Sequence, residues 1–272
     1  MNVLVGEKLS IITSKAQTTR HRIMGIVNGE DFQIVYSDTP GIIKPNYKLQ
    51  EKMMGFVNTA LDDADIILYI TDIIETPDKS IEYIERIKRS DIPLILVINK
   101  IDLAKENELK DATDYWLKVF PDATIIPVSA LKKRNVNTVF EAIIKALPEN
   151  PPYFPKDELT DKSERFFMSE IVREKILMQY KQEIPYSVEV DIESFKESKD
   201  IVKISGIIYV MRESQKGIII GKQGSSLKKV GTEARKDMEK FLDKKVFLEL
   251  FVKVRKDWRD NERTLKNFGY LS

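Results

Sequence analysis

Four short apolar runs that alternate with helical spacing constrain the first half of this chain more than any other feature. Each run has the length of a strand, and most of the segments between them repeat apolar residues at helical intervals. Runs of this kind, joined by helical crossovers, form mostly parallel sheets with both faces covered. We therefore expect an α/β sheet with strands at 32–41, 64–72, 93–102 and 123–130, and helices at 79–90, 108–120 and 135–147.

A proline-rich segment ends this alternating pattern. It contains Pro148, Pro151, Pro152 and Pro155, and such a cluster is typical of a linker. The predicted parts of the chain are a first domain over 1–148, a linker over 149–163 and a second domain over 164–272.

The second half has a different element order: helix, strand, strand, helix, helix, strand. The two central strands are expected to pair antiparallel around Ser198 and Lys199. The pattern indicates an α+β domain, with a helix at 165–182, strands at 185–197 and 200–212, a glycine-containing helical segment at 215–242 and a last strand at 245–258.

Composition excludes some kinds of site and leaves others open. There are 44 Lys and Arg residues against 43 Asp and Glu, so net charge does not indicate a partner. The chain has no cysteine and one histidine, His21, which excludes disulfides, thiolate metal sites and multi-histidine metal sites. No apolar run reaches the length of about 18 residues that a membrane span needs, and the N-terminus lacks the order of a signal peptide. We expect a cytoplasmic protein.

The motif NKID, residues 99–102, follows the predicted strand PLILVI. Ligands of open α/β sheets bind at this end of the strands. The Asp102 carboxylate can accept two hydrogen bonds from the ring N–H and exocyclic amine of guanine, whereas adenine offers neither donor there. Asn99 could tie neighbouring loops together, and the stem of Lys100 could cover the base. Alone, the tetrapeptide could equally be a polar loop after a buried strand.

Three other motifs agree with a nucleotide site. In DTPG, Asp38 could reach Mg²⁺ through water and the Gly41 N–H could face a γ-phosphate, with Thr39 and Pro40 between them. In VSA, residues 128–130, the backbone N–H groups of Ser129 and Ala130 could bind guanine O6. In QTTRH, Thr18 or Thr19 could supply a Mg²⁺ ligand from a mobile loop. The four motifs together favour a guanine-nucleotide domain over a nucleotide-free α/β domain. We expect the neighbouring His21 to be a solvated loop residue.

The segment GIIIGKQGSSLKKVG, residues 217–231, indicates RNA binding. A GxxG turn between helices lets a nucleic-acid backbone approach closely, because glycine has no side chain in the way. The alternative is a glycine-bounded helical turn with solvated lysines. The element order and the flanking residues favour a type II KH domain. Its expected RNA-binding residues are Ile219, Ile220, Gly221, Lys222, Gln223, Gly224, Lys228 and Lys229, with Ile218 also walling the groove. The mixed charges of 253–268 suggest a solvated helical face instead.

A nucleotide half followed by a KH half resembles the Era-like GTPases over nearly the whole chain. The segments that carry the resemblance are SKAQTTRHRI, DTPGI, NKID, VSA, ELTDKSERFFMSEIVREKIL, GIIIGKQGSSLKKVG and VKVRKDWRD. The resemblance implies a Ras-like P-loop GTPase domain, GTP or GDP with Mg²⁺ as ligands, and binding of small-subunit ribosomal RNA near its 3′ end. It also implies a role in maturation of the small ribosomal subunit and a loose peripheral contact with the inner face of the cell membrane.

One family motif is missing from this sequence. No GxxxxGK[ST] loop occurs, and MNVLVGEKLS is similar to the helix that follows that loop in the family. Either the start is assigned at an internal methionine, or the protein lacks the first strand and loop; we favour the first. As written, the first half is expected to be less stable than the second, because strands beside the absent one lose backbone partners. Ile42 stands where Ras-like enzymes place a water-orienting glutamine, so we expect slow hydrolysis.

Two functions remain open from the sequence. The first is a ribosome-assembly factor that binds and hydrolyses GTP as a switch and binds ribosomal RNA through its KH domain. The second is an RNA-binding protein that holds no nucleotide or does not turn it over. The sequence assigns no catalytic residue for hydrolysis.

Overall fold

The computed structural model of this chain describes residues 1–74 and 81–270. These residues form two compact units, which are described separately below. Unit 1 comprises the described residues of 1–8, 24–44 and 54–160, and unit 2 those of 9–23, 45–53 and from 161 onward. Two segments of the predicted first domain, 9–23 and 45–53, thus belong to unit 2, and the predicted linear boundaries stay a prediction.

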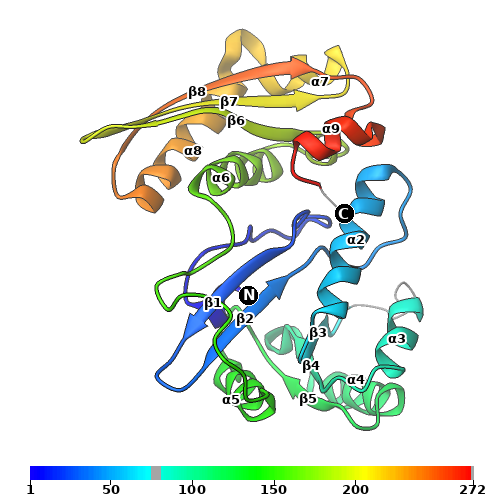
Figure 1. Cartoon of the computed structure of the whole chain (residues 1–272). Helices are drawn as coiled ribbons and strands as arrows, with labels where there is room; N and C mark the ends of the chain where they lie inside the picture. The colour runs from blue at the N-terminus through cyan, green and yellow to red at the C-terminus, as the bar shows by residue number, and fades with distance from the viewer. Residues whose placement is uncertain (75–80, 271–272) are drawn as a thin grey trace. The chain divides into compact units, whose positions relative to one another are not determined.

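Unit 1 is built on five strands in two sheets (Figure 1). A short turn joins the two strands of the first sheet, and the three strands of the second run parallel in the order β3-β4-β5. The first sheet is β1 (Ile23–Asn28) and β2 (Gln33–Asp38), and the second is β3 (Ile67–Asp72), β4 (Leu94–Asn99) and β5 (Thr124–Pro127).

Helices complete the α/β pattern of unit 1. β4 is buried on both faces, since Ile95 and Val97 pack in one core cluster and Leu96 and Ile98 in another. The covered faces of β4 confirm the expected α/β layering. The helices are α1 (Asn2–Val5), α2 (Lys48–Asp62), α3 (Ile81–Lys88), α4 (Glu106–Val119) and α5 (Val136–Ala146), and the first residues of α2 belong to unit 2.

The four predicted strands are all present, but not in one sheet. Among the described residues, β2 pairs only with β1 and β3 pairs only with β4. The sequence pattern missed β1 and α2. The helix predicted at 79–90 is α3, and its first two residues lie outside the described ranges.

Unit 2 has the predicted order of elements. Its sheet has the order β6-β7-β8, in which β6 and β7 are antiparallel and β7 and β8 are parallel. This is the expected α+β architecture of a type II KH domain. The elements are α6 (Glu164–Gln179), β6 (Glu189–Glu197), β7 (Ile201–Val210), α7 (Glu213–Ile220), α8 (Ser225–Leu242), β8 (Lys245–Val254) and α9 (Glu262–Asn267).

One face of this sheet packs against helices. The side chains of β8 alternate, with the even-numbered residues buried or half-buried and the odd-numbered ones exposed. Gly206 of β7 lies on the helix-covered face, where an added Cβ would lie 3.1 Å from Leu250. The other face carries the exposed side chains of β8.

The segment 9–23 packs into unit 2 through buried charges. Arg20 pairs with Glu189 at 3.0 Å, and the two side chains are 2% and 6% exposed. Arg20 also donates to the carbonyl oxygens of Val188 and Pro185, while the Tyr270 hydroxyl donates to Glu189 at 2.8 Å. These partners satisfy the buried groups.

Two expectations for polar segments are wrong. His21 is not solvated: its ring stacks on Tyr270 at a centroid distance of 4.2 Å and meets the edge of Phe166. Burial lowers the pKa of His21 to about 3, helped by the nearby positive charge of Arg173. The C-terminal segment is not merely a solvated face either, because Trp258 and Leu265 are fully buried.

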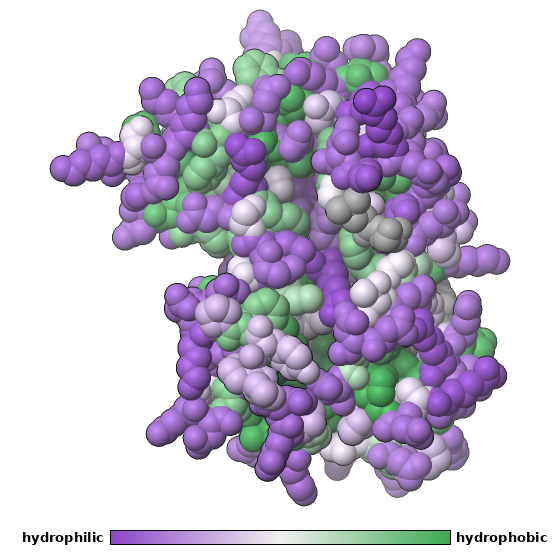
Figure 2. Space-filling view, in the orientation of Figure 1, coloured by the Kyte–Doolittle hydropathy of each residue, from purple (hydrophilic) through white to green (hydrophobic). Residues whose placement is uncertain are grey.

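The surface is largely hydrophilic in the view of Figure 2, with smaller apolar areas between the polar side chains. Within residues 1–74 and 81–270, no helix is long and apolar enough to cross a bilayer.

Candidate nucleotide and RNA sites

The loops after β4 and β5 are tied together by Asn99. Its side-chain oxygen accepts a hydrogen bond of 3.0 Å from the Ala130 backbone N–H. Parallel pairing of β4 and β5 brings the two strand ends to the same edge of the sheet. The predicted loop-tying function of Asn99 is therefore present in this geometry.

Asp102 is held by Ser129. The Ser129 hydroxyl donates to Oδ1 of Asp102 at 2.5 Å and accepts from the Lys132 N–H at 3.1 Å. Ser129 is completely buried, whereas Asp102 is exposed. Ser129 thus orients the carboxylate from its buried side, and the exposed side of Asp102 remains open to a ligand.

Lys100 adopts a left-handed conformation at the start of the turn Ile101–Leu103, with φ 63°. Its ammonium group pairs with Asp72 at the end of β3 at 2.5 Å. Asp72 stands opposite Asn99 in the β3–β4 register. Sequence reasoning missed Asp72, although its position at the end of an apolar strand was a usable signal.

This set of groups suits a guanine base. An exposed carboxylate that is already oriented can accept the ring N–H and the exocyclic amine without reorganising. Adenine lacks that pair of donors, so discrimination between the bases by Asp102 stays a prediction that this geometry allows. All of these residues lie in unit 1.

The motif DTPG follows β2, as predicted. Asp38 is the last residue of that strand, and the adjoining Pro40 is buried. Apart from its two chain neighbours, no atom of the described residues lies within 4 Å of a Cβ built on Gly41, and its φ is not in the left-handed region. Contact of Gly41 with a γ-phosphate stays a prediction.

Thr18 and Thr19 belong to unit 2, whereas Asp38 belongs to unit 1. The Thr18 hydroxyl donates to the Lys15 carbonyl at 2.6 Å, and the Thr18 carbonyl accepts from Arg173. The described ranges hold no group of three or more His, Cys, Asp or Glu residues that could bind a metal. Metal binding by these threonines and Asp38 stays a prediction.

The predicted GxxG turn lies between α7 and α8, and both of its glycines have a positive φ, which the sequence analysis did not predict. Gly221 has φ 72° and ψ 178°, and Gly224 has φ 78°. A Cβ on Gly221 would lie 2.2 Å from the Ser226 hydroxyl oxygen. Lys222 and Gln223 between them are exposed. Glycine is required at position 221 by both conformation and space.

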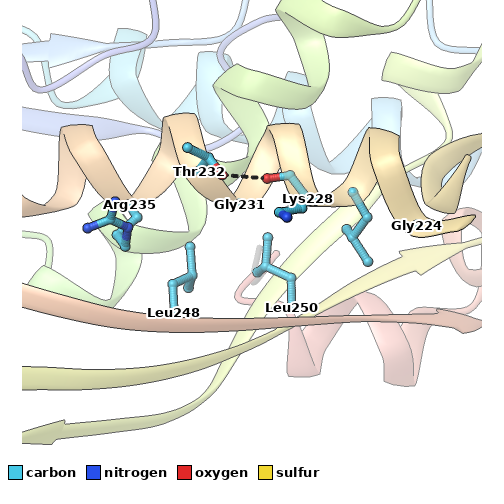
Figure 3. Close-up of a pocket in the computed structure, with 8 residues that line it drawn as sticks. Gly224, Lys228, Gly231, Thr232, Arg235, Leu248 and Leu250 are labelled. Carbon is cyan, nitrogen blue, oxygen red and sulfur yellow. Dashed lines mark hydrogen bonds between the residues drawn. The ribbon is translucent and has the colours of Figure 1, made fainter.

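A cavity of about 370 Å³ lies between α8 and β8 (Figure 3). Arg235, which lines the cavity, forms an ion pair of 2.9 Å with Glu239 on the same helix. The lining residues combine apolar side chains with two cationic ones, and they are Gly224, Leu227, Lys228, Gly231, Thr232, Arg235, Leu248 and Leu250. Such a lining fits an unstacked base and its phosphates.

Sequence reasoning found only two of these lining residues, Gly224 and Lys228. Gly231 and Arg235 continue the same helical face, so spacing alone could have found them. Lys229 is exposed but does not line the cavity.

Ile219 requires a correction. It was expected to wall the groove, but its side chain is completely buried and its carbonyl accepts the Tyr180 hydroxyl at 2.7 Å. Ile218 is 49% exposed and Ile220 is half-buried, so these two isoleucines keep access to a ligand. Only one face of a helix can enter the core, and here Ile219 occupies it.

Two family models match the chain. A model described as a 50S ribosome-binding GTPase matches residues 1–100, and a KH domain model matches residues 183–259.

Known proteins also match this chain over nearly its whole length. The chain is 46% identical over 272 residues to GTPase Era of Clostridium kluyveri, covering 99% of this chain and 93% of that protein. It is 45% identical to GTPase Era of Syntrophus aciditrophicus, covering 99% and 89%. A crystal structure of Era in complex with MgGDPNP and nucleotides 1506–1542 of 16S ribosomal RNA has a TM-score of 0.95 at 40% identity, covering 100% of this chain and 93% of that one. Aquifex aeolicus Era bound to GDP.AlF4- superposes equally well, with a TM-score of 0.95.

Proposed function

The chain belongs to the Era family of GTPases, and from this premise we propose that it is a GTP-dependent ribosome-assembly factor that binds small-subunit ribosomal RNA. Unit 1 supplies the guanine-recognising loops and unit 2 supplies the RNA groove. The observation that carries the proposal is the Asp102 carboxylate, which Ser129 orients at 2.5 Å in a loop that Asn99 ties to Ala130.

We assign the nucleotide to the residues at the ends of β2, β4 and β5. Asp102 accepts hydrogen bonds from the guanine base, and Lys100 covers the base. Asn99, Ser129 and Ala130 hold together the loops that follow β4 and β5. We assign the γ-phosphate of the nucleotide to the loop after β2, which contains Asp38, Thr39, Pro40 and Gly41. Mg²⁺, which accompanies GDPNP in the related Era complex, would be held by Asp38 with Thr18 or Thr19.

We assign single-stranded RNA near the 3′ end of the small-subunit ribosomal RNA to the GxxG turn and the cavity beside it. The exposed Lys222 and Lys228 meet phosphates, and Gly221 lets the backbone approach. The related Era complex contains 16S nucleotides 1506–1542. A cytoplasmic location, with a loose peripheral contact with the inner membrane face, rests on the family resemblance.

The test measures RNA binding with different nucleotides. A fluorescent RNA copying 16S nucleotides 1506–1542 is titrated with the full chain, alone and with the Mg²⁺ complexes of GDP, GDPNP and ADPNP. We expect the GDP and GDPNP forms to differ about fivefold or more in RNA affinity, a typical coupling between two sites, while ADPNP has no effect.

Two variants complete the test. Asp102→Ala is expected to abolish the nucleotide effect and keep RNA binding, and Lys222→Glu is expected to weaken RNA binding with every nucleotide. If the wild type binds RNA with the same affinity whichever nucleotide is present, the result would instead favour an RNA-binding protein without a GTP switch.

A further inference from the structure

The second face of the unit 2 sheet, called the open face below, exposes two aromatic rings on its edge strand β8, although Ile207 of β7 is buried and Tyr209 packs against Phe268. Phe247 and Phe251 are 50% and 49% exposed, although both lie in the regular strand β8. Neither ring contacts another aromatic ring within residues 1–74 and 81–270. Large apolar rings on an ordered strand are costly to leave in water, so this face is suited to a partner.

Lysines accompany these rings. Lys196 and Lys203 stand directly opposite each other in the β6–β7 register, and Lys203 stands opposite Phe247 in the β7–β8 register. Register partners share a face, so the three side chains form one row across the sheet. Like charges directly opposite each other destabilise a sheet. Both lysines are exposed, and no ion pair holds either one in the described part of the chain. An anion bound across this row would relieve their repulsion.

Acidic groups on the same face lie away from this row. Glu249 stands between the two rings along β8, and Asp191 shares a row with Ile207 and Phe251. A carboxylate repels phosphate but accepts hydrogen bonds from the exocyclic amines of cytosine, adenine and guanine. On this face, the lysines of β6 and β7 therefore suit phosphates, and the rings and Glu249 of β8 suit bases.

β8 connects this face to the cavity. It is an edge strand of its sheet (Figure 1), so no neighbouring strand covers its outer side among the described residues. Leu248 and Leu250 line the cavity, while Phe247, Glu249 and Phe251 point to the opposite face. A single strand of RNA that leaves the cavity can pass around this edge.

We propose that the open face of β6-β7-β8 is a second platform for single-stranded RNA. Bases stack on Phe247 and Phe251, Glu249 accepts amines of the intervening base, and Lys196 and Lys203 bind phosphates. This inference rests on the proposed RNA-binding function and extends the path of the RNA beyond the GxxG groove. The ligand is an unpaired segment that contains bases with an exocyclic amine, such as cytosine and adenine.

The experiment compares two RNA lengths on the full chain by fluorescence anisotropy. The short probe is a CA-repeat of about four nucleotides, the length that a GxxG loop clamps, and the long probe is a CA-repeat about three times as long. We expect the double variant Phe247→Ala/Phe251→Ala to bind the short probe like the wild type. Its affinity for the long probe should fall by at least about fivefold for each lost ring, as base–aromatic stacking requires.

Controls separate stacking from folding. Phe247→Tyr/Phe251→Tyr keeps both rings and should restore binding of the long probe. Tyr153→Ala removes a ring that is 69% exposed in unit 1 and should change neither affinity. Lys196→Gln/Lys203→Gln should make the salt dependence for the long probe shallower by about 1.4 in log–log slope.

The outcomes distinguish this platform from the groove. If the double alanine variant binds the long probe as tightly as the wild type does, the platform is refuted and the groove stands. The same holds if wild-type affinity does not depend on probe length. If the wild type binds neither probe, the proposed RNA function fails and the platform fails with it.

Discussion

The Ser129 hydroxyl donates a 2.5 Å hydrogen bond to Oδ1 of Asp102, although 27 positions separate the two residues in sequence. Ser129 is buried and Asp102 is exposed, so the serine fixes the carboxylate without occupying its ligand side. If Asp102 binds guanine as proposed, its geometry depends on the loop after β5 as well as on the loop after β4.

Removing this hydroxyl should weaken guanine binding and leave the fold intact. Ser129→Ala leaves Asp102 free to rotate, and the lost hydrogen bond is worth about 0.5–1.5 kcal/mol. We expect GDP affinity to fall about two- to tenfold in a fluorescence titration. Ser90→Ala, which removes a hydroxyl that bonds to the Ile87 carbonyl in the same unit, should not change it. Equal affinities of both variants would show that Ser129 does not position the base acceptor.

The two glycines of the GxxG turn should differ in their tolerance of alanine. Gly221→Ala places a Cβ 2.2 Å from the Ser226 hydroxyl oxygen in a conformation that only glycine adopts readily, which costs about 1–3 kcal/mol. A Cβ on Gly224 meets no atom within 4 Å, so only the φ of 78° opposes Gly224→Ala. Urea unfolding should show the larger loss for Gly221→Ala, together with the larger loss of RNA affinity. A greater effect at Gly224 would contradict this geometry.

The buried pair of Arg20 and Glu189 should be sensitive to removal of either charge. Glu189→Gln leaves the Arg20 guanidinium without its counter-charge in a site where both side chains are almost fully buried, which costs about 3–5 kcal/mol. Unfolding of unit 2 can be followed through Trp258 alone in a Trp116→Phe background, because the chain has two tryptophans, one in each unit.

The exposed pair of Lys48 and Glu262 provides the matched control. These side chains are 45% and 71% exposed, so Glu262→Gln should cost less than about 1 kcal/mol. Similar losses for the two variants would mean that the buried pair is not a tight structural contact.

The only histidine should make unit 2 less stable in mild acid. The pKa of His21 is about 3 in the folded chain and near 6.5 when unfolded, since burial disfavours its charged form. Between these values the unfolded state binds the extra proton, so stability falls as pH drops from about 6.5 toward 3. At pH 5 the loss is about 1–2 kcal/mol.

The variant His21→Phe can keep the ring stacked on Tyr270 without the titration. In the Trp116→Phe background, we expect the wild type to lose more stability than this variant between pH 7 and pH 5. Parallel losses would contradict the lowered pKa, because they would mean that His21 takes up its proton equally readily in the folded and the unfolded chain.

The sequence predicted the elements and motifs that local patterns determine. Apolar runs of strand length gave β2 to β5, and the polar residues after them gave Asn99, Asp102 and Ser129 at one sheet edge. The GxxG turn was predictable because the spacing of its two glycines is a local pattern, although their positive φ was not part of that prediction. In each case the determining residues lie within a few positions of one another.

Contacts between distant segments could not be predicted in this way. Arg20 and Glu189 are 169 positions apart, and no local pattern indicates that they pair. The stacking of His21 on Tyr270 depends on the same long-range packing. Three consecutive isoleucines in α7 were all expected to wall the groove, but Ile219 is completely buried, and no local pattern shows which of the three enters the core. The separation of β1-β2 from β3-β4-β5 likewise follows from tertiary pairing and not from strand propensity.

The most direct test of guanine recognition is a titration of fluorescent GDP with the full chain in the presence of Mg²⁺. Unlabelled GDP and unlabelled ATP serve as competitors, and Asp102→Ala is the matched variant. We expect saturable binding that GDP reverses, that ATP does not reverse, and that Asp102→Ala loses. Equal competition by ATP, or no saturable binding by a chain that still binds single-stranded RNA, would contradict a guanine switch in this protein.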